Sequence, residues 1–262
     1  MKIISWNVNG IRAVERKGDL EAFLKNHNPD VFLIQETKCK EEQVQPLIEK
    51  YADYQQFYHS AEKPGYAGTA IWVRKRLQDD KITRSQVTTG MPGFEDTEGR
   101  IVCIDLGNLA ILGVYFPNGG KSEEAWDGKL VFYDKFLTYV NALRKEGRQV
   151  IFTGDVNCAH EEIDLARPKD NEGKIGFHPQ ERACLSKWIA DGWIDVWREF
   201  NPGVGNVYSW WHVITRARLR NVGWRIDYFF VDEALLGKVK NIEYYTEQMG
   251  SDHCPVVLEI DK

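Results

Sequence analysis

The chain has 262 residues, 43% of them hydrophobic and 28% charged, and a formal net charge of −5 at pH 7. The length suits one large α/β domain or two small ones, and the acidic balance argues against a protein that coats nucleic acid non-specifically. No apolar run approaches membrane-spanning length, no signal peptide precedes the first strand, and the five scattered cysteines lack C-x-x-C spacing. We therefore expect an intracellular protein with reduced thiols, no zinc site and no membrane partner.

The first half of the chain predicts strands separated by helices, from its apolar spacing and turn residues. Residues 31–34 are apolar at every position, which is typical of a strand buried between two layers. Residues 54–112 favour β-structure, with a loop at 90–93. The predicted elements are strands at 2–8, 31–34, 69–73 and 100–104, a helix of about 17 residues from Ile11 to the break at Asn28, and a short helix at 41–50.

The second half continues this pattern with a long amphipathic helix at 123–146, followed by Gly147 as the predicted C-cap. The apolar stripe of this helix is predicted to be Leu130, Tyr133, Leu137, Val140 and Leu143. The other predicted elements are strands at 110–114, 150–153, 226–231 and 256–260, a long loop at 158–178 and a helix near 180–191. The irregular alternation favours one α/β domain over residues 1–262, with mixed sheets.

Polar side chains follow three of the apolar strands, at the point where each strand ends. In open α/β sheets, ligand sites form beyond the carboxyl ends of strands. The residues are Asn7 and Asn9, Glu36, and Asp155 and Asn157. Asp252 and His253 precede the last strand and reach the same edge if that strand runs antiparallel to the others. Oxygen ligands with one histidine predict a site for a hard cation such as Mg²⁺.

Each of these residues also has a structural explanation when taken alone. Glu36 fits a solvated loop or a helix cap, Asn7 fits a turn, and a lone histidine is more often structural than catalytic. Asp227 is different, because it lies inside an apolar strand and needs a partner. Asp252 and His253 are adjacent in an extended segment and point to opposite faces, so each needs its own partner. Several such placements at successive strand ends favour a functional site.

Residues 207–225 form a second feature, in which arginines alternate with tryptophans. Arginine positions phosphates, and aromatic rings stack on bases or pack against a sugar. The structural alternative makes the tryptophans core residues and the arginines a solvated face. We assign Trp211 to the core and the arginines to phosphate contact. The segment contains Arg216, Arg218, Arg220 and Arg225 with Trp210, Trp211 and Trp224.

Six segments occur in order along nearly the whole chain: 6–12 (WNVNGIR), 35–38 (QETK), 115–118 (YFPN), 154–157 (GDVN), 221–228 (NVGWRIDY) and 250–255 (GSDHCP). Together they resemble the exonuclease III family of apurinic/apyrimidinic (AP) endonucleases, within the deoxyribonuclease I-like superfamily. Each segment alone is modest evidence, whereas six in order are highly specific.

The resemblance implies a fold and an activity. The fold is a four-layer α/β sandwich, with two packed mixed β-sheets flanked by helices. The activity is Mg²⁺-dependent hydrolysis of double-stranded DNA 5′ to an abasic site, with Mn²⁺ able to replace Mg²⁺. The family also implies 3′→5′ exonuclease and 3′-phosphodiesterase activity, a role in base excision repair, and a monomer in the cytoplasm or nucleoid.

The resemblance also implies roles for individual residues. Glu36 would be the main metal ligand, and some family members carry Asp at the position of Asn9. Asp155 would position or deprotonate the attacking water, and Asn157 would hold the nucleophile or the developing charge. His253, oriented by Asp227, would bond a scissile phosphate oxygen. The implied metal site contains Glu36, Asn9, Asp252, Asp155, Asn157 and His253, and Tyr115 and Asn7 complete the phosphate site.

Further residues would contact the substrate. Trp210, Trp224 and Ile226 would line a pocket for the extruded abasic sugar, and Asn118 would contact phosphate. Lys121 lies where the family reaches into DNA. The remaining substrate-binding candidates are Arg12, Lys38 and Arg218.

Two alternatives remain at this point. A phosphodiesterase or phosphatase of the same fold would act on lipid or inositol phosphates, and fold alone does not decide between substrates. The segment of arginines and tryptophans argues against it. A DNA-binding scaffold without catalysis would be expected to lack Glu36, Asp155 or His253, and all three are present.

Overall fold

The computed structural model describes residues 1–75 and 86–261, and within these residues the strands form two six-stranded sheets and a two-stranded ribbon. In spatial order, the first sheet contains β13 (Val239–Tyr244), β14 (Val256–Ile260), β1 (Lys2–Asn7), β2 (Val31–Gln35), β4 (Thr69–Arg74) and β3 (Tyr54–His59). The second contains β5 (Val87–Thr89), β6 (Ile101–Leu106), β7 (Leu109–Tyr115), β8 (Gln149–Asp155), β12 (Asp227–Asp232) and β9 (Trp193–Asp195). The ribbon pairs β10 (Trp210–Trp211) with β11 (Gly223–Trp224).

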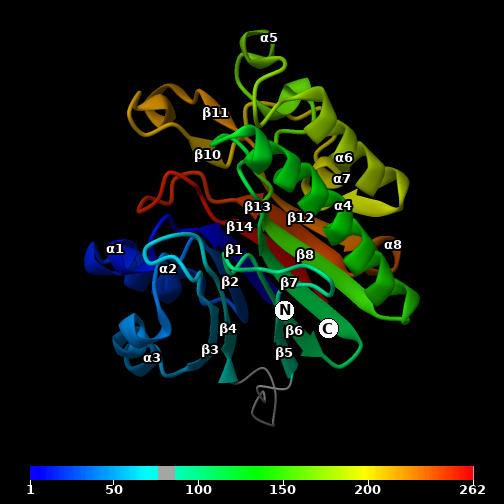
Figure 1. Cartoon of the computed structure of the whole chain (residues 1–262). Helices are drawn as coiled ribbons and strands as arrows, with labels where there is room; N and C mark the ends of the chain where they lie inside the picture. The colour runs from blue at the N-terminus through cyan, green and yellow to red at the C-terminus, as the bar shows by residue number, and fades with distance from the viewer. Residues whose placement is uncertain (76–85, 262) are drawn as a thin grey trace.

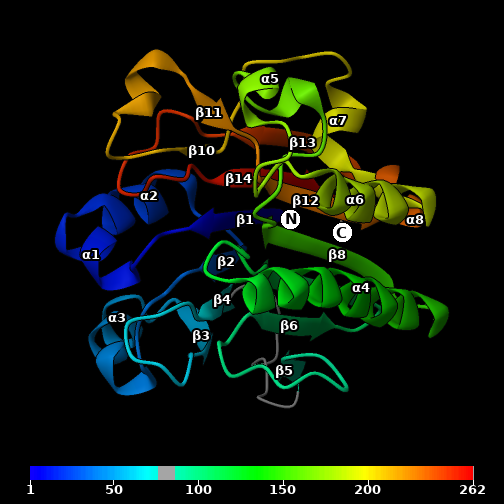
Figure 2. The same ribbon diagram turned by 45° about the horizontal axis from the view of Figure 1, so that its top comes forward.

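Helices cover the outer face of each sheet, so that the molecule has four layers (Figures 1 and 2). The helices on the side of the first sheet are α1 (Ile11–Arg16), α2 (Asp19–His27) and α3 (Gln45–Lys50). Those on the side of the second are α4 (Glu123–Lys145) and α6 (Pro179–Ala190). Shorter helices are η1 (Glu41–Gln43), η4 (Glu162–Asp164), α5 (Pro168–Asn171), α7 (Val196–Phe200), η5 (Ala217–Arg220) and α8 (Glu233–Leu236). The predicted four-layer α/β sandwich is confirmed.

Alternation along the strands divides the core into layers. Ile3 and Ile151 face the space between the two sheets, whereas Ile4 packs toward the first set of helices and Phe152 toward the second. Neighbouring strand residues point to opposite faces, so one strand contributes to two apolar layers. This explains why the central strands are apolar at nearly every position.

Strand direction brings the predicted site residues to one edge. β1 pairs in parallel with β2, and β7 pairs in parallel with β8. β14 runs antiparallel to β1, and β12 runs antiparallel to β8. The starts of β12 and β14 therefore lie beside the carboxyl ends of β1, β2, β7 and β8. The last strand thus runs antiparallel to β1, as required for Asp252 and His253 to reach the same edge.

The structure corrects several predicted elements. The helix predicted from Ile11 to Asn28 is two helices, because Gly18 adopts a left-handed φ of 80° between α1 and α2. The segment 158–178, predicted as a loop, contains η4 and α5. β13 was not predicted, since a bulge between Val239 and Asn241 breaks its alternation. Part of the β-structure expected over 54–112 falls on residues 76–85, outside the described residues.

The inward face of α4 also differs from the predicted stripe. Tyr133, Leu137 and Val140 are buried as predicted, but Leu130 is only half-buried. Lys129 is fully buried in its place. Gly147, with a left-handed φ of 83°, follows the end of this helix. Among the residues that the structure describes, every helix is too short or too polar to cross a membrane.

Candidate active site

Polar residues from both sheets meet at the shared edge. In the second sheet, Asp155 is the register partner of Tyr115 on one side and of Asp227 on the other, so these three residues stand on neighbouring strands. In the first sheet, Asn7 ends β1 and Glu36 follows β2. The edge therefore gathers the polar strand ends that the sequence predicts to lie together.

His253 lies between two carboxylates. Its Nδ1 is 2.8 Å from Asp227 Oδ2, and its Nε2 is 3.7 Å from Asp155 Oδ2. Burial alone would lower the pKa of His253, but the charges of Asp227 and Asp155 outweigh burial and raise the pKa well above that of an ordinary histidine. The imidazole is therefore a cation at neutral pH, and Asp227 fixes its orientation.

Asp155 also has a raised pKa. Burial is the largest cause, and the negative charges of Asp227 and Glu36 add to it, while His253 acts in the opposite direction. One carboxylate oxygen accepts a hydrogen bond from the backbone N–H of Asn157 (2.8 Å), and the other accepts one from Asn7 (2.9 Å). A carboxylate with a raised pKa is a better proton acceptor than an exposed one. Asp155 is thus suited to take a proton from water.

Asn7 links the two sheets at this edge. Its buried side-chain amide donates to Glu36 Oε1 and to Asp155 Oδ2, both at 2.9 Å. Its side-chain oxygen Oδ1 accepts from the backbone N–H of Asn9 at 3.0 Å. One neutral amide therefore spaces two carboxylates that would otherwise repel each other.

A candidate metal centre lies in the same cluster. Carboxylate oxygens of Glu36 and Asp155 and a ring nitrogen of His253 lie within 4.8 Å of one another. While His253 is protonated its ring has no free lone pair, so the two carboxylates are the ligands available in this group. Carboxylate oxygens in excess suit a hard divalent cation. Asp227 Oδ1 adds a buried oxygen for which the described residues supply no hydrogen-bond partner. The donor set therefore fits a cation such as Mg²⁺ or Mn²⁺.

The outer part of this centre already attracts a positive charge. Lys38, predicted to bind substrate, places its Nζ 2.8 Å from Glu36 Oε2 and donates to Asn9 Oδ1. Asn9 in turn donates to Asp252 Oδ1 at 2.9 Å. Glu36, Asn9 and Asp252, three of the six predicted metal ligands, thus lie along one chain of contacts, with a lysine ammonium between the first two.

Four residues at the site have a left-handed backbone conformation. Asn9, Glu36, Lys38 and Asn157 have left-handed φ angles of 46°, 50°, 50° and 57°. Residues other than glycine adopt this region at a cost of about 1–3 kcal/mol each, and such residues cluster at functional sites. The strain turns these side chains toward the shared edge.

Amide and phenol donors line the side of the site next to the second sheet. Asn118 Nδ2 donates to Asn157 Oδ1 at 3.0 Å, and Asn157 Nδ2 donates to the carbonyl of Phe116 at 2.9 Å. Tyr115 is buried beneath the guanidinium of Arg100, which lies 4.9 Å from its ring centre. Burial raises the pKa of Tyr115 well above its usual value, so its hydroxyl remains a donor.

An apolar cluster lies beside His253. Trp210 and Trp224 cross at 78° with ring centres 6.4 Å apart, and both pack against Ile226 in one cluster with Leu165 and Phe177. The Trp210 Nε1 donates to Asp252 Oδ2 at 3.1 Å. The structure therefore brings together all three residues predicted to line a sugar pocket and joins them to a predicted metal ligand.

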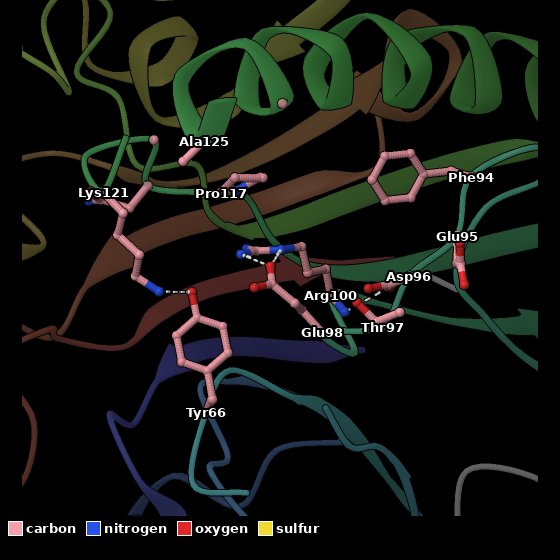
Figure 3. Close-up of a pocket in the computed structure, with 13 residues that line it drawn as sticks. Tyr66, Phe94, Glu95, Asp96, Thr97, Glu98, Arg100, Pro117, Lys121 and Ala125 are labelled. Carbon is pink, nitrogen blue, oxygen red and sulfur yellow. Dashed lines mark hydrogen bonds and ion pairs between the residues drawn. The ribbon is translucent and has the colours of Figure 1, made fainter. Parts of the chain in front are cut away.

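A cavity of about 280 Å³, lined by both charged and apolar residues, lies next to Asn118 (Figure 3). Lys121, predicted to contact DNA, lines it and donates to the hydroxyl of Tyr66 at 2.6 Å. Arg100 bonds Glu98 and the carbonyl of Tyr115 in the same wall. Arg12, another predicted contact, lies at the exposed rim and donates to the carbonyl of Lys38 at 3.3 Å.

The arginines of residues 207–225 do not all have the predicted role. Arg225 is only 1% exposed and pairs with Asp164 (2.8 Å) and Asp195 (2.7 Å), so the phosphate contact predicted for it is wrong. Arg218 is half-buried and donates to the carbonyls of Thr246, Gln248 and Ser251, beside Asp252. Trp211 is buried, as predicted.

Sequence reasoning missed several residues that hold the site. Ser209 Oγ accepts from the backbone N–H groups of Ile226 (2.9 Å) and Asp227 (3.0 Å), and Ser251 Oγ donates to the carbonyl of Asn7 (2.7 Å). Lys129 lies four residues before Tyr133, on the same helical face, and this spacing was the available signal that it faces inward. The serines carry no comparable signal.

Comparison with known proteins identifies the family. The Endonuclease/Exonuclease/phosphatase family matches residues 4–253. The chain belongs to this family. An exodeoxyribonuclease of Bacillus subtilis is 39% identical over the full length of both chains. A DNA-(apurinic or apyrimidinic site) endonuclease of Dictyostelium discoideum is 34% identical over 100% of this chain and 71% of its own.

A solved structure agrees with these relatives. The AP endonuclease of Leishmania major superposes with a TM-score of 0.88 at 26% identity, covering 100% of this chain and 87% of that one. The resemblance to the exonuclease III family of AP endonucleases is therefore confirmed. As a member of the Endonuclease/Exonuclease/phosphatase family, the chain is an enzyme of the nuclease type, with a candidate acidic metal site at the edge of its two sheets.

Proposed function

We propose that this enzyme hydrolyses the DNA backbone 5′ to abasic sites with the help of Mg²⁺ or Mn²⁺, as one catalytic domain acting on duplex DNA as a monomer. We include 3′→5′ exonuclease and 3′-phosphodiesterase activity at the same centre. The observation that carries the proposal is the position of His253, a buried cation between Asp227 and Asp155, at the edge where Glu36 and the asparagine donors converge. Relatives named as an exodeoxyribonuclease and an AP endonuclease support it.

The residues suit an in-line attack on a phosphodiester. Asp155, with its raised pKa, would accept a proton from the attacking water. His253 would donate from Nε2 to a non-bridging phosphate oxygen, since its Nδ1 is engaged by Asp227. The amide groups of Asn157 and Asn118 and the hydroxyl of Tyr115 would bond the remaining oxygens as negative charge builds up.

Glu36 would hold the metal, with Asn9 and Asp252 beside it. Lys38 would either leave the Glu36 carboxylate or share it with the metal. When bound, the cation would stabilise negative charge on the phosphate and the leaving oxygen. Asn7 would keep Glu36 and Asp155 apart and correctly turned, because its amide bonds both. The protein would therefore supply hydrogen-bond donors that are already in place around the carboxylates of Glu36 and Asp155.

The apolar cluster of Trp210, Trp224 and Ile226 supports selectivity for abasic sites. A normal nucleotide must unstack its base to leave the helix, at a cost of a few kcal/mol, whereas an abasic sugar has no base to unstack. Because the cluster is apolar and its two indole rings are only half-buried, it would pack against a bare sugar and disfavour a sugar that carries a base. Selectivity would then follow from shape.

A duplex with one abasic-site analogue tests the proposal. We expect a single nick 5′ to the analogue in Mg²⁺ or Mn²⁺, a 3′-hydroxyl product, and no nick in a chelator. The matched undamaged duplex is the control. A wild-type enzyme that leaves the damaged duplex intact in Mg²⁺, while it hydrolyses an inositol or lipid phosphate, would replace the proposal with the phosphatase alternative.

A further inference from the structure

Lys129 and Glu181 form a buried ion pair that takes no direct part in the proposed reaction. Lys129 lies on α4 and Glu181 lies in the first turn of α6. Both side chains are 0% exposed, and Lys129 Nζ donates to Glu181 Oε1. A buried ion pair is weak evidence for stability, since desolvation offsets the attraction of the charges. Its other contacts therefore indicate what it does.

Lys129 holds the two chain segments that carry the asparagine donors. Its ammonium donates to the backbone carbonyls of Asn118 (3.1 Å) and Asn157 (2.8 Å). The stem of Lys129 also lies against Gly119, where an added Cβ would stand 3.0 Å from Lys129 Cδ. Asn118 and Asn157 thus rest on one charged donor, directly behind the hydrogen bond that joins their side chains.

Glu181 extends this support to the apolar cluster of Trp224 and Ile226. Its Oε2 accepts from the backbone N–H groups of Gly176 (2.8 Å) and His178 (3.0 Å). Gly176 has a left-handed φ of 88° and lies so close to Trp224 that a Cβ would come within 3.1 Å of the ring. The carbonyl of Gly176 accepts from Ala159, which packs in the same cluster as Ile226.

We propose that Lys129 and Glu181 are positioning residues of the active site, which fix the Asn118–Asn157 amide pair on one side and the Trp224 wall on the other. The inference rests on the proposed function, because the amide pair matters only if it bonds the substrate. Asn157 sits in a strained left-handed conformation, and such a residue persists only where surrounding contacts hold it. The charged donor on its carbonyl is one of those contacts.

The experiment compares variants that change the ion pair with a variant that only weakens the same helix. The double variant Lys129→Met/Glu181→Gln removes both charges together, so that neither is left buried alone. Lys129→Arg keeps a charged donor toward Glu181 and the two carbonyls. Val140→Ala, buried on the same helix away from the site, is the control for lost packing. Single-turnover cleavage and KM are measured on the abasic-analogue duplex in Mg²⁺.

We expect the double variant to cleave about 100-fold more slowly, because a misplacement of about 1 Å has an effect of this size. KM should change little, Lys129→Arg should recover part of the rate, and Val140→Ala should cleave at the wild-type rate. A folded double variant with wild-type cleavage would overturn the inference about Lys129 and Glu181 and leave the proposed function standing. Absence of cleavage by the wild type would instead overturn the proposed function.

A measurement on the wild type covers the case in which the double variant does not fold. The ¹⁵N resonance of the Lys129 ammonium is followed while a duplex with a non-cleavable abasic analogue is added. A positioning role predicts a slowly exchanging ammonium resonance whose chemical shift changes little on binding, since Lys129 already holds the carbonyls of Asn118 and Asn157 in the free enzyme. A resonance that is lost to exchange in the free enzyme and appears only with bound duplex would overturn the inference.

Discussion

Two clusters of charged side chains, each with buried and partly buried members, adjoin the start of β12, and they differ in charge balance. In the first, Glu36, Asp155, Asp227 and Asp252 face the positive charges of His253 and Lys38. The second cluster contains Arg225, which lies two residues before Asp227, and Arg198. Their charges are matched by Asp164 and Asp195. We refer to them as the site cluster and the arginine cluster.

The pKa of Asp155 in the site cluster and that of Asp164 in the arginine cluster are shifted in opposite directions, whereas the pKa of Asp252 is lowered like that of Asp164. Burial tends to raise the pKa of Asp164, but Arg225 and Arg198 outweigh it and lower the pKa. Burial and the neighbouring carboxylates raise the pKa of Asp155, so its surroundings disfavour the charged form. A matched cluster stabilises the fold, whereas an unmatched one is poised to bind a cation or accept a proton.

The largest expected effect is the loss of cleavage when the site cluster is changed. Asp155→Asn and His253→Ala should each reduce the cleavage rate on the order of 10³-fold, because proton transfer and charge stabilisation are lost. DNA binding should remain, and Asp155→Asn should unfold at or above the wild-type temperature. Single-turnover kinetics, a binding titration and thermal unfolding measure these effects. Wild-type cleavage rates in either variant would refute the assigned roles.

The arginine cluster should respond in the opposite way. Arg225→Met should lower the free energy of unfolding by about 3–5 kcal/mol, since it leaves two buried carboxylates without their partner. Arg220→Met, on an exposed residue of the same segment, is the matched control and should change stability little. Urea unfolding measures both. Equal stability of the two variants would show that the arginine cluster does not stabilise the fold.

Cation binding should stabilise the site cluster. At a Mg²⁺ concentration about 100 times Kd, the free energy of unfolding should rise by about 2.7 kcal/mol in the wild type. Glu36→Gln should lose most of this gain, while Glu49→Gln, on the exposed face of α3, should keep it. Thermal unfolding with and without Mg²⁺ tests this, and an equal gain in both variants would place the cation elsewhere.

Acid should affect the arginine cluster modestly. Because the folded pKa of Asp164 lies below its unfolded value, its contribution to stability is present above the unfolded pKa of about 4 and is lost as pH falls through the folded pKa. The stability difference between the wild type and Arg225→Met should therefore shrink below about pH 4. Urea unfolding at several pH values measures it, and a constant difference would contradict the assignment.

The sequence predicts the site residues better than the buried charged residues that surround them. Strand ends and the family resemblance sufficed to predict that His253 pairs with Asp227 and lies near Asp155 and Glu36. Arg225 was misassigned because an arginine beside Trp224 fits a phosphate contact as well as an ion pair. Its partners Asp164 and Asp195 are 61 and 30 residues away, so only the tertiary structure decides.

The same limit applies to Lys129 and to β13. The partner of Lys129 is Glu181, 52 residues later, and no local pattern connects the two. The bulge in β13 removes the period of two on which strand prediction depends. Local patterns therefore predicted most strands and helices, while the buried charged contacts between distant segments required the structure.

The most direct test of the charge comparison is an anomalous difference map from crystals soaked in Mn²⁺. An unmatched site cluster predicts a peak within ligand distance of the Glu36 carboxylate, on the side of the edge that holds Asp155. It predicts no peak at Asp164 or Asp195, whose charges Arg225 already neutralises. Density for the cation only at exposed surface carboxylates, with none beside Glu36, would contradict the account.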